Sequence, residues 1–172
     1  IVMKKIKVNI REMMKGMQKV YIENGVTTAQ DGATSKMALK LLKLSNAFGA
    51  LKIDVVAYPL MNDGGREMIK ANPKMDRTYK KHLKLGGYKV VLDGSPQGRS
   101  AWMSQPYLGG EEGYCGYPWM PDEEVCKYAL QAVNDNQQLL AHCNGDAAGD
   151  QFLNAYENAL AKSSNPNKDN LR

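Results

Sequence analysis

The sequence predicts an α/β protein with a parallel sheet, and three observations support this. Helix-like and strand-like segments alternate along the 172 residues, the strand-like runs are short and β-branched, and Asn-Gly or Asp-Gly pairs separate several of them. Alternation of this kind places helices outside a parallel sheet. About four strands are predicted, which suffice for a small doubly wound sheet and also make half of an eight-stranded barrel. Periodicity alone leaves both architectures open.

The spacing of apolar residues defines the individual elements. Helices are predicted from residue 6 to the Asn24-Gly25 pair and over 35–48, 121–134 and 146–162, with a weakly patterned one over 66–85 that Pro73 breaks. Strands are predicted over 26–30, 51–60, 88–93 and 138–143. A connection as long as 94–120, rich in glycine and aromatic residues, is typical of a functional loop. We expect one domain over 1–162 and a loose polar tail over 163–172.

Composition and charge limit the classes of partner. The net charge is +5, but the densest basic stretch, 74–89, begins as the solvent-facing side of a predicted helix, so no nucleic-acid partner is expected. No apolar run reaches 18 residues and the first residues lack signal-peptide features, so no membrane partner is expected. The three cysteines suit neither a disulfide framework nor a zinc finger. The sequence therefore predicts a reduced, cytoplasmic protein.

Lys89 and His142 are the candidate residues within strands. Lys89 lies among apolar residues, where an inward amine is costly unless neutralised or paired, although a lysine at a strand start can also reach solvent. His142 lies at the C-terminal end of a strand, where parallel α/β folds carry their sites, and it can equally be a satisfied structural residue.

Four more residues follow the ends of these two strands. We expect Asp93, Ser95, Arg99 and Asp146 to contact a substrate or to support the residues that do. Arg99 is suited to pair with a carboxylate of a substrate. Alternatively, it pairs with Asp93, and this ion pair would anchor the loop. Asp146 has a second explanation as the N-cap of the last helix.

Three blocks of this sequence resemble the metal-dependent amidohydrolases of the amidohydrolase-3 type. They cover 25–32, 89–107 and 141–148, and they are similar to the second, fourth and fifth strands of that family with their following loops. The resemblance implies a partial (β/α)8 TIM barrel over residues 1–162. It also implies hydrolysis of carbon–nitrogen bonds other than peptide bonds, in a small amide-like substrate, by water activated on a divalent metal, usually zinc.

The resemblance also implies roles for two residues. Lys89 matches the lysine that the family carboxylates to bridge two metals, and His142 matches the histidine ligand of the fifth strand. The family further needs a His-x-His pair, a histidine on its sixth strand and an aspartate on its eighth, whereas this sequence has two histidines and no such pair. We therefore expect an internal fragment of a longer enzyme, inactive as it stands, that binds metal weakly or not at all.

Three further expectations concern the chain as a whole. A half-barrel leaves two unpaired sheet edges and an uncovered inner face, so the fragment is expected to self-associate through those edges or faces, or to have a disordered long loop. A non-catalytic α/β module that binds a partner through its basic face and aromatic loop remains an alternative. A third interpretation is an open-sheet enzyme that uses Asp93 and His142 as acid and base.

Overall fold

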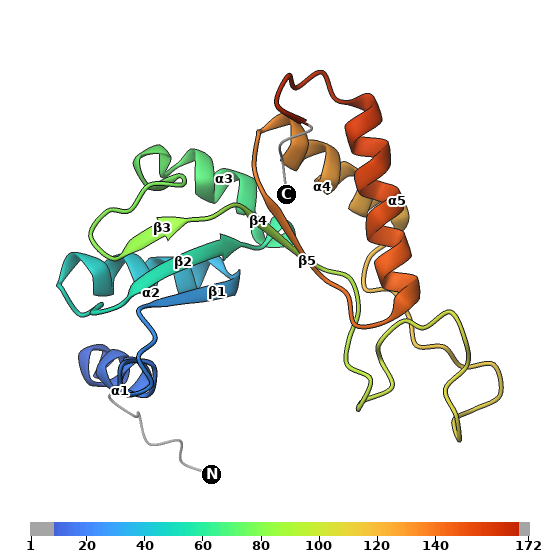
Figure 1. The fold of residues 1–172 in the computed structure, drawn as a ribbon, viewed down its shortest axis with the longest axis horizontal. Helices are drawn as coiled ribbons and strands as arrows, with labels where there is room; N and C mark the ends of the chain where they lie inside the picture. The colour runs from blue at the N-terminus through green and yellow to red at the C-terminus, as the bar shows by residue number, and fades with distance from the viewer. Residues whose placement is uncertain (1–8, 169–172) are drawn as a thin grey trace, which may run out of the picture.

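The computed structural model describes residues 9–168 and shows helices packed around parallel strands (Figure 1). In chain order the elements are α1 (Ile10–Glu23), β1 (Thr28–Thr34), α2 (Lys36–Ala47), β2 (Asp54–Pro59), η1 (Met61–Asp63), α3 (Gly65–Lys70), η2 (Pro73–Met75), β3 (Leu83–Leu85), β4 (Tyr88–Val91), α4 (Asp122–Asn134), β5 (Leu139–His142) and α5 (Asp146–Lys162). Residues 6–8 of the predicted first helix and 169–172 of the predicted tail lie outside the described residues.

All strand pairs in the sheet are parallel. β1 pairs with β2, β2 with β3, and β4 with β5, while a bridge between Leu60 and Lys89 joins the end of β2 to β4. Only Gly86 and Gly87 separate β3 from β4, so these two segments act as one interrupted strand. The strands thus form a three-stranded sheet in the order β1, β2, β3 and a two-stranded sheet of β4 and β5, which the interrupted strand and the bridge between Leu60 and Lys89 connect. This confirms the predicted α/β fold with about four parallel strands and is consistent with a partial barrel.

The two glycines lie where the interrupted strand changes its neighbour. The backbone N–H of Gly86 donates to Ala57 O of β2 (2.9 Å), whereas the N–H of Tyr88 donates to Gln138 O ahead of β5 (2.8 Å). Gly87 has a φ of +149°, and a Cβ there would lie 2.3 Å from Gln138 O. A side chain at this position would therefore force the two strands apart.

The helix predicted over 66–85 is wrong beyond residue 70. α3 ends there, Pro73 opens the short helix η2, and residues 83–85 form the strand β3. Leu83 and Leu85 are buried while Lys84 between them is half-buried, which is the alternation of a strand. The basic residues of 74–89 therefore do not line one helix face, and His82 lies immediately before β3.

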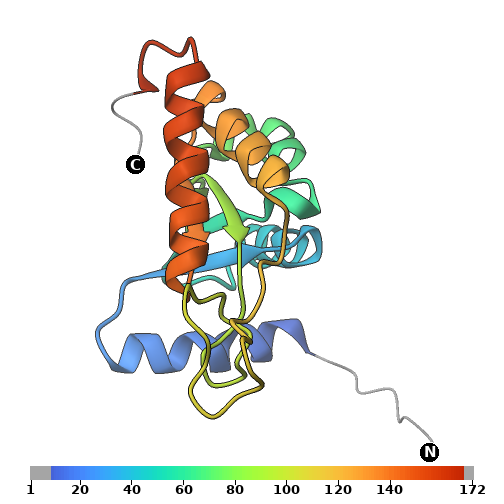
Figure 2. The same ribbon diagram turned by 90° about the vertical axis from the view of Figure 1, so that its right-hand side faces the viewer.

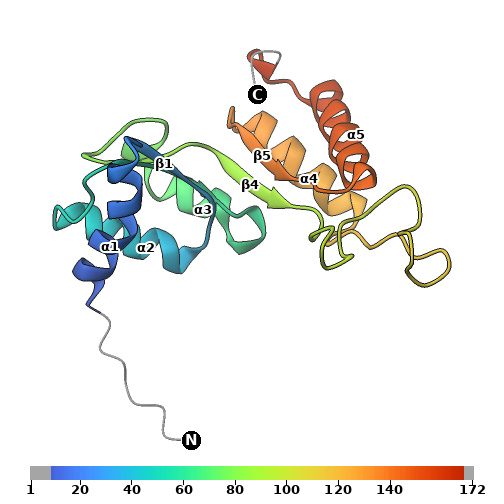
Figure 3. The same cartoon turned by 60° about the horizontal axis from the view of Figure 1, so that its bottom comes forward.

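The two faces of the sheet differ in what covers them. Helices α2 and α3 lie on the same side of the strands (Figure 3). Val55 and Ala57 of β2 pack in one core with Leu39 of α2 and Ile69 of α3. Tyr88, Val90 and Leu92 belong to that core, so the side chains between them in sequence point to the opposite face. That opposite face would line the interior of a barrel.

The outer helices are fastened by polar side chains. Buried Gln18 of α1 donates to Ala50 O (2.9 Å) and accepts from Lys52 N (2.6 Å), which holds α1 against the chain leading into β2. In the predicted tail, Ser163 Oγ donates to Asn134 Oδ1 (2.6 Å) at the end of α4. The first residue of this tail is therefore held against α4. Among residues 9–168, no helix has the length and apolar character needed to cross a membrane.

Candidate functional site

Lys89 and His142 lie on the same face of neighbouring strands. Lys89 pairs with Leu140, and Val91 pairs with His142. Residues paired across parallel strands point the same way, as do residues two apart along one strand. Both side chains therefore lie on the face that the helices do not cover, towards the C-terminal ends of β4 and β5.

The surroundings of Lys89 lower the pKa of its amine. Partial burial lowers the pKa of Lys89, and the neighbouring Cys143 opposes this shift only in part. Burial and the charge of Asp93 raise the pKa of Cys143, so this residue remains a thiol and does not act as a ready nucleophile. The structure thus shows a lysine, on the same face as His142, whose amine loses its proton more easily than that of an ordinary lysine.

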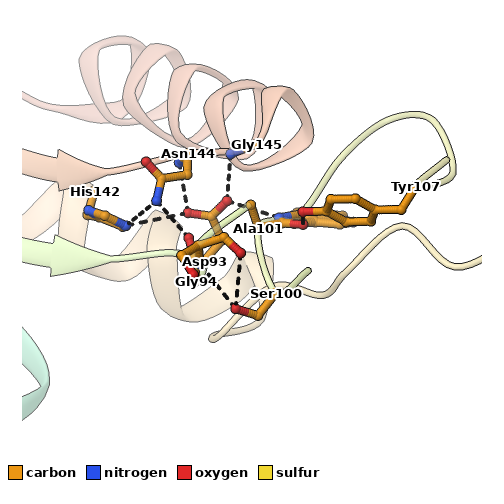
Figure 4. Close-up of polar contacts among 10 residues, drawn as sticks. Asp93, Gly94, Ser100, Ala101, Tyr107, His142, Asn144 and Gly145 are labelled. Atoms are coloured by element: carbon orange, nitrogen blue, oxygen red, sulfur yellow. Dashed lines mark hydrogen bonds and ion pairs between the residues drawn. The ribbon is translucent and has the colours of Figure 1, made fainter. Parts of the chain in front are cut away.

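Asp93, two residues beyond β4, joins two segments that are distant in sequence. Its carboxylate is fully buried and accepts three backbone hydrogen bonds, from Trp102 N (3.0 Å), Asn144 N (2.9 Å) and Gly145 N (2.7 Å) (Figure 4). The last two donors lie at the N-terminal end of α5, where negative charge is favourable. Asp93 therefore holds the long loop against the turn that follows β5.

Asn144 links this turn to the histidine. Its Nδ2 donates to Gly94 O (2.8 Å) and lies 3.1 Å from His142 Nε2 (Figure 4). The same Nε2 is 3.9 Å from Asp93 Oδ1, and the His142 side chain is 40% exposed. Since Asp93 is fully buried and engaged by backbone donors, the arrangement favours a supporting role over a free acid or base.

Asp146 holds the long loop at a second point. It is the first residue of α5, whose N-cap is Gly145, so the N-cap assignment for Asp146 is wrong by one residue. Its Oδ1 accepts from Ser104 N (2.8 Å), and its Oδ2 accepts from the Ser104 hydroxyl. These hydrogen bonds lower the pKa of Asp146.

The loop itself, 94–120, extends past the ends of β4 and β5 (Figure 2). Ser95 Oγ accepts from Gly98 N (3.2 Å) in an exposed turn, and Arg99 Nη1 donates to Gly109 O (2.9 Å). The sequence allowed an ion pair between Asp93 and Arg99 as an anchor of the loop, and among the described residues this alternative is wrong. Both side chains form hydrogen bonds with backbone groups instead. The expected contacts of Ser95 and Arg99 with a substrate stay predictions.

The donors present fit part of a metal site. Within residues 9–168, His, Cys, Asp and Glu side chains form no group of three or more that could hold a metal ion. Lys89 and His142 are two potential donors on one face, whereas zinc sites generally take three or four protein ligands.

Sequence reasoning missed Asn144, Gly145 and Ser104 as residues that build the site. Gly145 packs directly on the loop, because a Cβ there would lie 1.8 Å from Trp102 O. The available signal was the Asn-Gly pair between His142 and the start of the last helix. Its partners lie about forty to fifty residues away in sequence, so no local pattern identifies them.

Comparisons with known proteins agree with this architecture. Crystal structures of metal-dependent hydrolases from Pyrococcus horikoshii OT3 and Pyrococcus furiosus each match with a TM-score of 0.75 and 23% identity, over 91% and 90% of this chain. The match covers 32% and 33% of those chains, so this chain spans about a third of their length. At this identity the likeness shows a shared fold.

Two sequence comparisons complete this picture. Protein LONG AFTER FAR-RED 3 from Arabidopsis thaliana is 33% identical over 79 residues, which are 46% of this chain and 13% of that protein. The sequence profile of the Amidohydrolase family matches residues 3–171, almost the whole chain. On that match, the chain belongs to the amidohydrolase family.

Proposed function

We propose that this chain forms part of the active site of a metal-dependent hydrolase that cleaves carbon–nitrogen bonds other than peptide bonds in a small, amide-like substrate. Membership of the amidohydrolase family supports the hydrolase class. The observation that carries the site assignment is the position of Lys89 and His142, on one face at neighbouring strand ends. In parallel barrels, catalytic residues come from this end of the strands.

Lys89 is proposed to act as a carbamate. A neutral amine adds to carbon dioxide, a nitrogen–carbon bond forms and a proton leaves, which yields an anion with two oxygen donors. The lowered pKa of Lys89 supports this step because it increases the neutral fraction of the amine. The residue would then be an anionic ligand on the face that it shares with His142.

The implied metal is divalent, and we propose zinc. When bound, it would polarise the substrate carbonyl and lower the pKa of a bound water. The protein residues have separate tasks: Lys89 and His142 supply donors, Asp93 fixes the ends of β4 and β5, and Asp146 holds Ser104 of the loop beside them. Asp93, Ser95, Arg99 and Asp146 are thus proposed to support or contact the substrate.

With two donors, the chain as it stands is proposed to bind zinc weakly and to be inactive. Metal analysis after dialysis against a weak chelator is expected to show well under one zinc per chain. Stoichiometric, tightly held zinc would contradict this proposal. All three cysteines are free thiols, which supports placing the protein in the reducing cytoplasm.

The functional test uses a polypeptide that carries this segment together with the remaining strands of the barrel. Lys89→Ala and His142→Ala are each expected to lose bound metal and amide hydrolysis, whereas Lys40→Ala, on the exposed surface of α2, is expected to keep both. Wild-type activity and metal content in the first two variants would overturn the assignment.

A further inference from the structure

We propose that the tip of the long loop, residues 108–113, docks into a lysine-rimmed hollow between α2 and α3 of a second copy of this chain. The tip offers one apolar side chain and two carboxylates, and the hollow offers an apolar floor and three ammonium groups. Both surfaces lie outside the proposed metal site, so the contact does not depend on the proposed hydrolase function.

Behind its tip, the long loop is a braced arm. Two backbone hydrogen bonds, from Met103 N to Cys115 O (2.7 Å) and from Tyr107 N to Tyr114 O (2.9 Å), join its two sides. The rings of Tyr107 and Tyr114 stack with their centroids 6.1 Å apart. Because the arm is ordered before it meets a partner, binding through its tip loses little conformational entropy.

The tip combines an apolar side chain with negative charge. Leu108 is 95% exposed, more than any other large apolar residue of 9–168, and Glu111 and Glu112 are exposed as well. Residues 90–126 contain six acidic residues and a single basic one, Arg99, although the whole chain has a net charge of +5. The arm of one copy is therefore attracted to the basic part of another.

The hollow supplies the complementary groups. It has a volume of about 190 Å³, and its lining consists of two apolar residues and three lysines, namely Leu39, Met68, Lys36, Lys40 and Lys43. Leu39 and Met68 are buried and form the floor, whereas the three lysines are exposed around it. The floor has room for one leucine side chain, and the rim is suited to carboxylates.

The rim of the hollow keeps most of its positive charge. Lys43 Nζ donates to the neutral side chain of Asn72 (2.5 Å), and the ion pair of Lys36 with Asp63 is long, at 3.9 Å. An exposed pair at this distance contributes little, so an arriving carboxylate can compete for the ammonium group. The surrounding segment 36–89 has twelve basic and four acidic residues, which adds to the attraction.

The positions of the two surfaces make the contact intermolecular. In Figures 1 and 3, α2 lies at the left of the molecule and the arm lies at the right. The arm therefore does not reach the hollow of its own chain, and the contact joins two copies head to tail. A contact this small is expected to be weak, with a Kd of about 1 mM.

The test is a concentration series of 1H–15N NMR spectra of the full chain at low ionic strength, from about 0.05 to about 1 mM. The backbone amides of residues 108–113 and of α2 are expected to shift together as the concentration rises. About 0.5 M salt is expected to reverse both shifts, because salt screens the charges. Leu108→Ser leaves the charges unchanged and is expected to weaken the contact about tenfold.

A charge exchange separates this contact from other modes of association. The arm variant carries Glu111→Lys and Glu112→Lys, and the hollow variant carries Lys36→Glu and Lys43→Glu. Each is expected to lose the concentration-dependent shifts by itself. A mixture of the two is expected to regain them, because the intact arm of one variant then meets the intact hollow of the other.

The matched control carries Lys127→Glu and Lys162→Glu, two exposed lysines of α4 and α5, and is expected to keep the wild-type shifts. Wild-type amides that do not move with concentration would overturn the proposal without the need for any variant. A mixture of folded arm and hollow variants that behaves like each alone would also overturn it. So would a hollow that binds phosphatidylserine vesicles in a chain whose copies do not bind each other, since its partner would then be a membrane surface.

Discussion

At the scale of single residues, Asp93 is the group on which the arrangement of the site depends. It has no exposed surface, and each of its three hydrogen bonds satisfies a backbone N–H of another segment. Asp93→Asn replaces a carboxylate oxygen with an NH2 group that faces a backbone donor. The substitution is expected to lower the free energy of unfolding by about 3 kcal/mol.

Urea denaturation of the full chain measures this loss. Asp150→Asn is the matched control, because Asp150 is exposed on α5, and a change within about 0.5 kcal/mol is expected there. Equal stability of Asp93→Asn and the control would show that the buried carboxylate is not what joins the two segments.

Asp146 gives a prediction about pH. Hydrogen bonds from Ser104 lower the pKa of Asp146 in the folded chain. A depressed carboxyl pKa stabilises the fold above the unfolded value, and this contribution is lost as the pH falls through the folded value. Ser104→Ala is expected to raise the pKa of Asp146 towards its ordinary value, measured by a 13C NMR titration of the carboxyl carbon. An unchanged pKa would assign the shift to another contact.

The residues of the site could be predicted from the sequence better than their partners. Asp93, Arg99 and Asp146 follow strand ends and were recognisable as polar groups at the right edge of the sheet. Pairing Asp93 with Arg99 was the natural expectation because opposite charges stand out in a sequence. Backbone N–H groups are not distinguished in a sequence, and Asp93 accepts its hydrogen bonds from three of them.

At the scale of elements, the contact between α5 and the long loop depends on a missing side chain. A Cβ on Gly145 would lie 1.8 Å from Trp102 O, a distance that only backbone movement can relieve. Gly145→Ala is therefore expected to lower the free energy of unfolding by about 3 kcal/mol or to displace the loop. Thermal unfolding measures the first effect, and the intensity of tryptophan fluorescence, which comes from Trp102 and Trp119 of the same loop, reports the second.

Gly149, one turn further along α5, is the matched control. A Cβ there meets nothing within 4 Å, so Gly149→Ala is expected to stabilise the helix by up to about 1 kcal/mol. If Gly145→Ala lowers the free energy of unfolding and Gly149→Ala raises it, the steric constraint lies at the contact between Gly145 and the loop. A stabilising Gly145→Ala would show that the loop adapts without cost.

The strand β3 shows why one element was not predictable. Leu83 and Leu85 alternate with Lys84, but three residues are too few to distinguish a strand from the end of the helix proposed before them. β3 is fixed by its pairing with β2, a partner about thirty residues earlier. The longer elements depend on their own sequence: α2 follows from periodicity and its N-cap Ser35, and α5 follows from periodicity.

At the scale of the whole molecule, the described sheet ends in two open edges. β1 pairs on one side with β2, and β5 pairs on one side with β4, with no further strand on either outer side among residues 9–168. Helix α1, before the first of these edges, exposes Met17, Val20 and Ile22. Open parallel edges flanked by exposed apolar side chains favour association.

We therefore expect the average mass of the chain, measured by light scattering, to rise with concentration. Val20→Glu places a charge on the exposed face of α1 and is expected to weaken association by about tenfold, since burying a valine contributes about 1.5 kcal/mol. Phe48→Glu removes an exposed apolar residue at the C-terminal end of α2, in the helical layer, and is expected to have little effect. A compact wild-type monomer at the highest concentration would mean that this chain covers its edges without a second copy. A larger effect of Phe48→Glu than of Val20→Glu would instead place the interface on the helical layer.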